Sequence, residues 1–319
     1  MKKIFFALIA LVTFFNVGQA QNDTMYIMKT GNIIGKYKVE NVDSVIFYTP
    51  VINSTINIET VNIPAGTFTM GTPESEVNHA NNETQFQVTL SAFTMSKYEI
   101  TNAQFAAFLN DKNIGATGMY PAGAYPTQVL LYESEESQNW GMHYIAGDWV
   151  PVAGYENHPV INVTWYGAVE FATFAGARLP TEAEWEYACR AGTTTPFSTG
   201  DCLSDAQANY NWSMPYSTCT NNNTTSPGTT QAVGSYATNA YGLYDMHGNV
   251  MEWCSDWYGT YPTTPQINPT GALTGTHCVI RGGGWLDYSR NCRSGKRDHT
   301  PPDSYYSTFG IRLVFPSKQ

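Results

Sequence analysis

Periodic apolar runs are scarce in this chain, and that scarcity constrains its fold more than any other feature. From Gly192 onward, Gly, Asn, Thr and aromatic residues dominate, and few stretches repeat with the period of a helix or a strand. Long ordered loops joined by short regular elements are typical of this pattern. We therefore predict an α+β domain that is rich in loops, with few short strands and about three helices.

The first helix is expected after Thr101. Thr101 and Gln104 form a capping-box pattern, in which each side chain satisfies a free amide at the start of a helix. Phe105, Phe108 and Leu109 follow at the spacing of one buried helical face.

Two further helices are expected at Trp165–Ala175 and Thr181–Arg190. The second begins with another capping box, Thr181 to Glu184, and Gly176 and Gly192 stand where helices end. Upstream, the apolar runs 61–63 and 67–70 are separated by Pro64, Ala65 and Gly66, which predicts a β-hairpin. The polar stretch 221–228 is expected to be an exposed insert.

The N-terminus carries the pattern of a secretory signal peptide over residues 1–20. Two lysines precede the apolar run Ile4–Phe15, and small residues follow it. The run is shorter than the roughly 18 residues of a membrane span, although an uncleaved anchor is an alternative. No cysteine follows for a lipid anchor. We expect an exported protein, located in the periplasm, at the cell surface or outside the cell.

Residues 21–55 are expected to form a small β-rich region and residues 56–319 the main domain. Strand patterns occur at Met25–Met28 and Val45–Tyr48, and the polar stretch Asn53–Asn57 reads as the junction. Without the leader lysines the chain counts 14 basic and 26 acidic residues, a formal charge of −12. Such a surface excludes nucleic acid as a natural partner.

Eight segments of the chain, in order, resemble the formylglycine-generating enzyme (sulfatase-modifying factor) family. The matching segments are 63–71, 98–104, 159–165, 178–188, 241–253, 281–285, 297–303 and 309–313. The resemblance implies a fold related to C-type lectins, with bound calcium. It also implies a peptide-binding cleft, here with Gly284, Trp285, Arg290 and Arg293; alternatively, Arg290, Arg293 and Arg297 pair with Asp287, Asp298 or Asp303.

Catalytic members of the family oxidise a cysteine to formylglycine with a copper ion held by two cysteines. Counting from the Gly282–Trp285 turn places Asp287 at the first copper position, and counting back from Arg297 places Ser289 at the second. Oxygen ligands bind cuprous ion poorly, so we expect no copper and no such oxidation. The six cysteines allow fifteen pairings. Cys292 is expected in a disulfide, with Cys254 as one candidate partner.

The resemblance also assigns calcium ligands. In the second calcium loop they are Asp245, the carbonyls of Gly248 and Val250, and Glu252; hard oxygen ligands in irregular loops suit calcium. The first calcium loop would use Asn209 and the carbonyl of Tyr210. Alternatively, Asp245 and Glu252 cap local backbone amides.

Each of the other candidate functional residues also has a purely structural interpretation. His247 can be a general base or a hydrogen-bonded structural residue. The tryptophans 165, 185, 253 and 257 can form a binding platform or belong to the core. The histidines lack the spacing of the family's iron-dependent branch, and no hydrolase motif occurs.

Two functions remain. The first is a calcium-stabilised binding or scaffold module for a peptide or a glycan, without copper chemistry. The second is an oxidase of the family that works through a rearranged site.

Overall fold

The computed structural model describes residues 24–29, 32–38 and 56–316. They belong to two units, 1–50 and 51–319, which are described separately. In the first unit, β1 (Thr24–Lys29) and β2 (Asn32–Lys38) pair antiparallel, with an irregularity after Ile27. The expected strand Met25–Met28 lies within β1. The leader and the expected strand Val45–Tyr48 lie outside the described residues.

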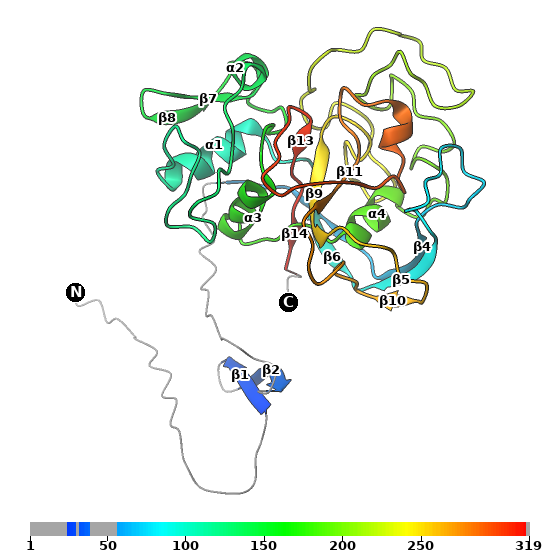
Figure 1. Ribbon diagram of the computed structural model, residues 1–319, viewed down its shortest axis with the longest axis horizontal. Coiled ribbons are helices and arrows are strands. Elements are labelled where there is room, and N and C mark those ends of the chain that lie inside the picture. The colour runs from blue at the N-terminus through cyan, green and yellow to red at the C-terminus, as the bar shows by residue number, and fades with distance from the viewer. Residues whose placement is uncertain (1–23, 30–31, 39–55, 317–319) are drawn as a thin grey trace, which may run out of the picture. The chain divides into compact units, whose positions relative to one another are not determined.

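Three small sheets organise the second unit (Figure 1). The first orders β10 (Gln266–Ile267), β5 (Phe86–Leu90) and β4 (Gly66–Met70). The second orders β12 (Asp298–Thr300), β11 (Cys278–Arg281), β9 (Met251–Trp257) and β13 (Phe309–Gly310). The third orders β14 (Val314–Phe315), β6 (Phe93–Ser96) and β3 (Thr60–Ile63). A separate hairpin joins β7 (Met142–Ile145) to β8 (Asp148–Pro151).

The expected hairpin at Pro64, Ala65 and Gly66 is wrong. The strand β3 pairs with β6 and β4 pairs with β5, so the two predicted partners lie in different sheets. A three-residue hairpin loop usually has one residue with a positive φ angle, and proline locks φ near −65°. None of the three residues has a positive φ. The chain therefore passes from one sheet to the next instead of folding back.

The three expected helices are present. Helices α1 (Asn102–Asp111) and α4 (Glu182–Arg190) both begin with a complete capping box, on Thr101 and Thr181 respectively. Helix α3 (Trp165–Phe174) begins at the N-cap Thr164. A fourth helix, α2 (Glu135–Trp140), was not predicted, because its six residues are too few to show a period. None of the described helices is long and apolar enough to cross a bilayer.

The apolar core consists of separate clusters, which form around different helices. Phe105 and Phe108 of α1 pack on Phe171 of α3 with ring centroids 5.2 and 5.7 Å apart. Helix α4 buries Trp185 in a second cluster, which includes β4 to β6. In Figure 1, α1 and α3 lie on one side of β9 and β11, and α4 lies on the other. Of the four tryptophans considered above, 185 and 253 are fully buried, and 165 and 257 are partly buried.

Buried ion pairs connect α4 to distant loops. Glu186 accepts hydrogen bonds from Arg190 at 2.8 Å, from Arg281 at 2.5 Å and from the Gly71 amide at 2.9 Å. Glu186 and Arg281 are both 0% exposed. Although burial opposes ionisation of Glu186, the charges of Arg190 and Arg281 hold its pKa below the ordinary value. The ionised pair therefore ties α4 to β4 and β11.

Replacing Glu186 by glutamine removes the carboxylate that pairs with Arg190, and leaves Arg281 with only the longer carboxylate contact, to Glu182 at 3.6 Å. Breaking a buried pair from one side costs about 3–5 kcal/mol, so the free energy of unfolding of Glu186→Gln should fall by about that much. Urea unfolding measures the change. Glu59→Gln, which breaks the solvent-exposed pair with Lys97, is the matched control and should behave like the wild type. Equal midpoints for all three proteins would contradict the structural role of Glu186.

Candidate functional site

The segment that follows the glycine turn holds the two expected copper positions. Gly282 and Gly283 have φ angles of +100° and +69°, which favour glycine. A Cβ atom on Gly283 would lie 2.7 Å from the Cys292 sulfur, so this turn packs directly on that thiol. The 3₁₀ helix η2 (Ser289–Cys292) closes the segment.

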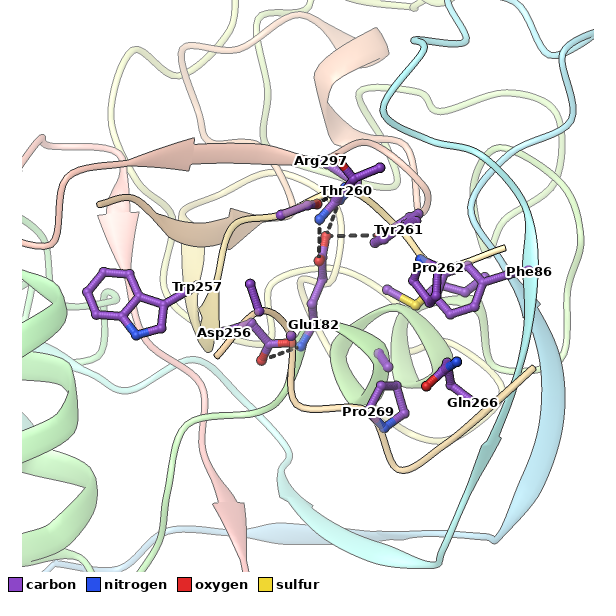
Figure 2. Close-up of a pocket in the computed structure, with 15 residues that line it drawn as sticks. Phe86, Glu182, Asp256, Trp257, Thr260, Tyr261, Pro262, Gln266, Pro269 and Arg297 are labelled. Carbon is purple, nitrogen blue, oxygen red and sulfur yellow. Dashed lines mark hydrogen bonds and ion pairs between the residues drawn. The ribbon is translucent and has the colours of Figure 1, made fainter. Parts of the chain in front are cut away.

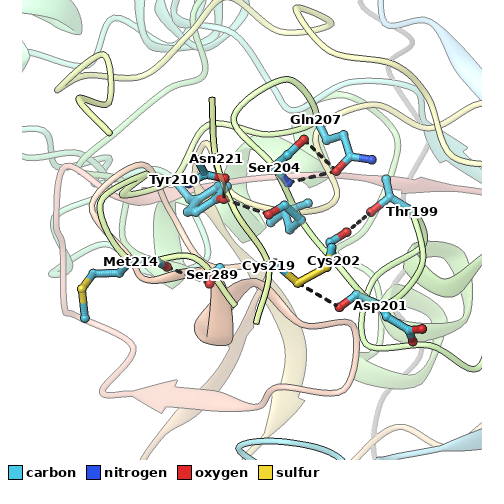
Figure 3. Close-up of a disulfide and its surroundings, with 11 residues drawn as sticks. Thr199, Asp201, Cys202, Ser204, Gln207, Tyr210, Met214, Cys219, Asn221 and Ser289 are labelled. Atoms are coloured by element: carbon cyan, nitrogen blue, oxygen red, sulfur yellow. Dashed lines mark hydrogen bonds between the residues drawn. A yellow bond between two sulfur atoms is a disulfide. The ribbon is translucent and has the colours of Figure 1, made fainter. Parts of the chain in front are cut away.

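Both oxygen side chains at the copper positions are engaged within the protein. Asp287 accepts hydrogen bonds from the Gly284 amide at 2.9 Å and from the Asn291 side chain at 3.1 Å. Ser289 donates to the Met214 carbonyl at 2.8 Å (Figure 3). Burial raises the pKa of Asp287. Both side chains thus have structural partners in the loops around them.

The expected disulfide of Cys292 is wrong. The disulfide joins Cys202 to Cys219, with Cα atoms 5.7 Å apart, whereas Cys189, Cys254, Cys278 and Cys292 are free and buried (Figure 3). Cys254 and Cys292 are packed in different apolar clusters and do not pair. Burial raises the pKa of Cys292 well above its usual value, so its thiol stays protonated.

His247 has the surroundings of a structural residue. Its Nδ1 lies 2.8 Å from the Cys292 carbonyl oxygen, and its Nε2 accepts a hydrogen bond from the Ser198 amide at 3.0 Å. Burial lowers the pKa of His247 to about 4, so the ring is neutral near pH 7. These contacts favour the structural alternative over a general base.

The four residues expected in one cleft do not line a common hollow, because Gly284 and Trp285 are buried. Arg290 and Arg293 line a hollow of about 260 Å³. Arg293 is buried in ion pairs with Glu76 at 2.6 Å and Glu83 at 2.9 Å. Arg297 pairs with Glu182 at 2.7 Å. The predicted pairing of Arg293 and Arg297 with acidic residues is confirmed. The predicted partners, Asp287, Asp298 and Asp303, are wrong, because the carboxylates that pair with these arginines are distant in sequence.

Trp285 instead supports a second, larger groove. Its indole N–H donates to the Ser307 carbonyl at 2.9 Å, and Gly284 packs against Thr308. The groove has a volume of about 540 Å³ and is hereafter called the tyrosine groove. Its lining comes from two loops and the start of α2: Tyr132, Ser134, Glu136, Asn162, Asp303, Ser304, Tyr305, Tyr306 and Ser307.

Polar side chains on the tyrosine groove are arranged in a chain. Asn162 donates to the Ser134 hydroxyl at 2.8 Å, and Ser134 donates to Glu136 at 2.8 Å. Tyr132 and Tyr305 stack with centroids 3.7 Å apart, and Tyr306 is 60% exposed. Neither Lys nor Arg is among the groove's described lining residues. The sequence analysis missed this groove, although the adjacent tyrosines 305 and 306 in a polar loop were a visible signal.

The first calcium loop contains buried oxygens that lack a partner. The side-chain amide of Asn209 donates a hydrogen bond to the Thr229 carbonyl at 2.9 Å. The Asn209 Oδ1 and the Thr229 hydroxyl are buried and have no hydrogen-bond partner among the described residues. Buried polar atoms without partners are rare in proteins. Unpaired oxygens of an amide and a hydroxyl are donors that calcium accepts, so these residues fit a calcium ion.

The second calcium loop has the negative charge that a cation needs, but not all of its expected ligands are free to bind one. Three buried carboxyl groups lie here, those of Glu99, Asp245 and Glu252. The positive charge of the Arg312 guanidinium interacts with all three. Burial raises the pKa of Asp245 to about 6. Glu252, however, is already engaged: Arg312 donates to it at 3.0 Å and Trp185 at 2.6 Å. No group of three or more His, Cys, Asp or Glu side chains in the described part of the chain has metal-site geometry.

Comparison with known proteins decides the family. The Sulfatase-modifying factor enzyme 1-like domain matches residues 51–316. This chain belongs to the sulfatase-modifying factor family. The resemblance noted in the sequence and the α+β, loop-rich fold are thereby confirmed.

Several relatives are formylglycine-generating enzymes. The enzyme of Mus musculus is 32% identical over 276 residues, which cover 80% of this chain and 74% of that protein. The enzyme of Streptomyces coelicolor is also 32% identical, over 88% of its length. Other family members carry different names. The structure of PvdO from Pseudomonas aeruginosa is similar, with a TM-score of 0.60 and 27% identity over 80% of this chain and 93% of that chain.

Proposed function

We propose that this member of the sulfatase-modifying factor family is an exported binding module that does not carry out copper-dependent oxidation. The observation that carries the proposal is the state of the copper positions. Asp287 and Ser289 hold oxygen atoms there, and each side chain is used to fix the surrounding loops. Cys292, the one cysteine of the segment, is 0% exposed and protonated. Cuprous ion prefers thiolate pairs, which this segment does not offer.

The tyrosine groove is the proposed binding site. Hydroxyl, carboxylate and amide groups border exposed tyrosine rings, and such a mixture suits the alternating polar and apolar faces of a sugar. The absence of basic residues among the described lining residues disfavours a phosphorylated or sulfated ligand. We therefore favour a neutral glycan, with a peptide as the alternative ligand.

Calcium is proposed as a structural ion. The unpaired oxygens of Asn209 and Thr229 would be its ligands in the first loop, and Asp245 would contribute in the second. The two loops are joined directly, because Asn249 donates its amide hydrogen to the Asn209 carbonyl at 2.7 Å. A bound ion would offset the excess of buried carboxylates and hold both loops beside the glycine turn.

An oxidase with a rearranged site is the second candidate. The observation in its favour is the identity of about one third with formylglycine-generating enzymes. Cys292 packs on the glycine turn and is influenced by Cys189, and both thiols are buried and free. Such a site would require these thiols to become accessible and to lose their protons together.

Copper titration separates the two functions. The purified protein should show neither tight one-to-one binding of cuprous ion nor thiolate-to-copper absorption, because no sulfur pair is available. Cys292→Ser should titrate like the wild type. Stoichiometric binding that disappears in Cys292→Ser would establish the oxidase alternative.

Removal of the exposed ring of Tyr306 tests the groove. A panel of neutral oligosaccharides and unmodified peptides identifies the ligand, and calorimetry then gives its affinity. Tyr306→Ala should weaken binding about 2- to 12-fold, the range expected for one aromatic contact. Tyr306→Phe keeps the ring and should bind nearly as the wild type does. Binding of peptides alone, or unchanged affinity in Tyr306→Ala, would contradict the glycan proposal.

Calcium should stabilise the folded protein. At a concentration 100-fold above its dissociation constant, a bound ion adds about 2.7 kcal/mol to the free energy of unfolding. Thermal unfolding with calcium and with a chelator measures the difference. Asn209→Ala should lose most of it, whereas Asn222→Ala, at an exposed position in the neighbouring loop, should keep it. A wild-type melting temperature that is insensitive to calcium would refute the structural role.

A further inference from the structure

A cavity of about 310 Å³ lies beside the N-terminus of α4 and shares no lining residue with the tyrosine groove (Figure 2). The loop from Asp256 to Ala272 forms most of its wall, and Met70 and Phe86 of β4 and β5 complete it. The volume falls in the range of small-molecule sites. Its lining is largely apolar and aromatic, with three charged residues at the base: Glu182, Asp256 and Arg297.

Two of these charges satisfy each other. Arg297 donates to both oxygens of Glu182, at 2.7 and 2.8 Å, and Tyr261 adds a third hydrogen bond at 3.0 Å. The remaining Arg297 nitrogen donates to the carbonyls of Asn82 and Gly259. Figure 2 shows Glu182 extending from α4 toward Arg297 and Tyr261. Neither charge is therefore left for an ionic ligand.

Asp256 is different, because half of its carboxylate is unused. Its Oδ2 accepts the Glu182 amide at 3.1 Å, as a cap on α4, and the Ser255 hydroxyl at 3.0 Å. Its Oδ1 accepts no hydrogen bond from the described residues, and no cation pairs with it there. Asp256 is only 3% exposed. A buried carboxylate that lines a cavity and keeps one oxygen free can accept a hydrogen bond from a ligand.

Gly271 leaves that oxygen open. A Cβ atom on Gly271 would lie 2.8 Å from the Asp256 Oδ1, and the φ angle of +76° also favours glycine there. Gln266 provides a second acceptor: its amide nitrogen donates to Thr264, which leaves its Oε1 available. These two free polar atoms of the cavity accept hydrogen bonds, and most of the lining around them is apolar.

We propose that this cavity binds a small organic cation, namely a protonated amine on an apolar or aromatic body. The ammonium group donates to the Asp256 Oδ1 and the Gln266 Oε1, and the body packs against Phe86, Tyr261 and the two prolines 262 and 269. An anion finds no free positive group, because Arg297 is fully engaged with Glu182 and two carbonyls. This second site is independent of the tyrosine groove.

Benzylamine, with benzyl alcohol as its neutral counterpart, tests the proposal. At about pH 8 Asp256 is ionised, since burial raises its pKa only to about 7. Ligand-detected NMR and calorimetry should show benzylammonium binding about tenfold or more tightly than benzyl alcohol, because the hydrogen bond and the charge act together. Equal affinities, or no binding of benzylammonium, would overturn the proposal without any variant.

Two variants test whether the ligand binds in this cavity. Asp256→Asn keeps an oxygen to cap α4 but presents an amide donor to the ligand, so the preference for the cation should disappear. Gln266→Leu removes the second acceptor at the half-buried edge of the cavity and should weaken benzylammonium binding several-fold. Asp148→Asn removes the same charge at an exposed remote position and should change nothing. Unchanged affinity in Gln266→Leu, or in a folded Asp256→Asn, would refute this location.

Discussion

The ion pair between Glu186 and Arg281 is the interaction on which the rest of the main domain depends. Helix α4 brings Glu186 into the interior, where it receives Arg190 from its own helix, Arg281 from β11 and the amide of Gly71 at the end of β4. Arg281 in turn donates to the carbonyls of Ser294 and Gly295, so it also fixes the segment after the glycine turn. Loops that have few periodic apolar contacts are thereby held at defined positions.

The same use of charge recurs at two other places. Arg293 anchors the loop around Glu76 and Glu83, and Arg312 anchors Glu252 and the carbonyls of Ser96 and Tyr244. A buried pair is not in itself a strong source of stability, because desolvation offsets much of its attraction. Its value in this fold is geometric: a guanidinium with five donors fixes several backbone carbonyls at once. Such anchors suit a domain that consists mostly of loops.

This framework surrounds the glycine turn. The family domain extends over residues 51–316, and Trp285 supports the loop beside the turn. At the expected copper positions, Asp287 and Ser289 are hydrogen-bonded to the surrounding loops. Polar groups with free hydrogen-bonding capacity line the tyrosine groove, and Asp256 keeps one such oxygen in its cavity. In the proposed binding role, these groups would form the hydrogen bonds to a ligand.

The sequence alone determined the family, the loop-rich α+β class, the three longer helices and the capping boxes on Thr101 and Thr181. These features depend on residues within a few positions of one another, whose pattern is visible in the chain. Tertiary structure decided the partners of Arg293 and Arg297, the disulfide Cys202–Cys219 and the separation of β3 from β4. It also brought Tyr132 to Tyr305 and left one oxygen of Asp256 open. Each of these features depends on contacts between residues that are distant in sequence, or on space left by packing. Such contacts and spaces leave no recognisable pattern among neighbouring residues of the sequence.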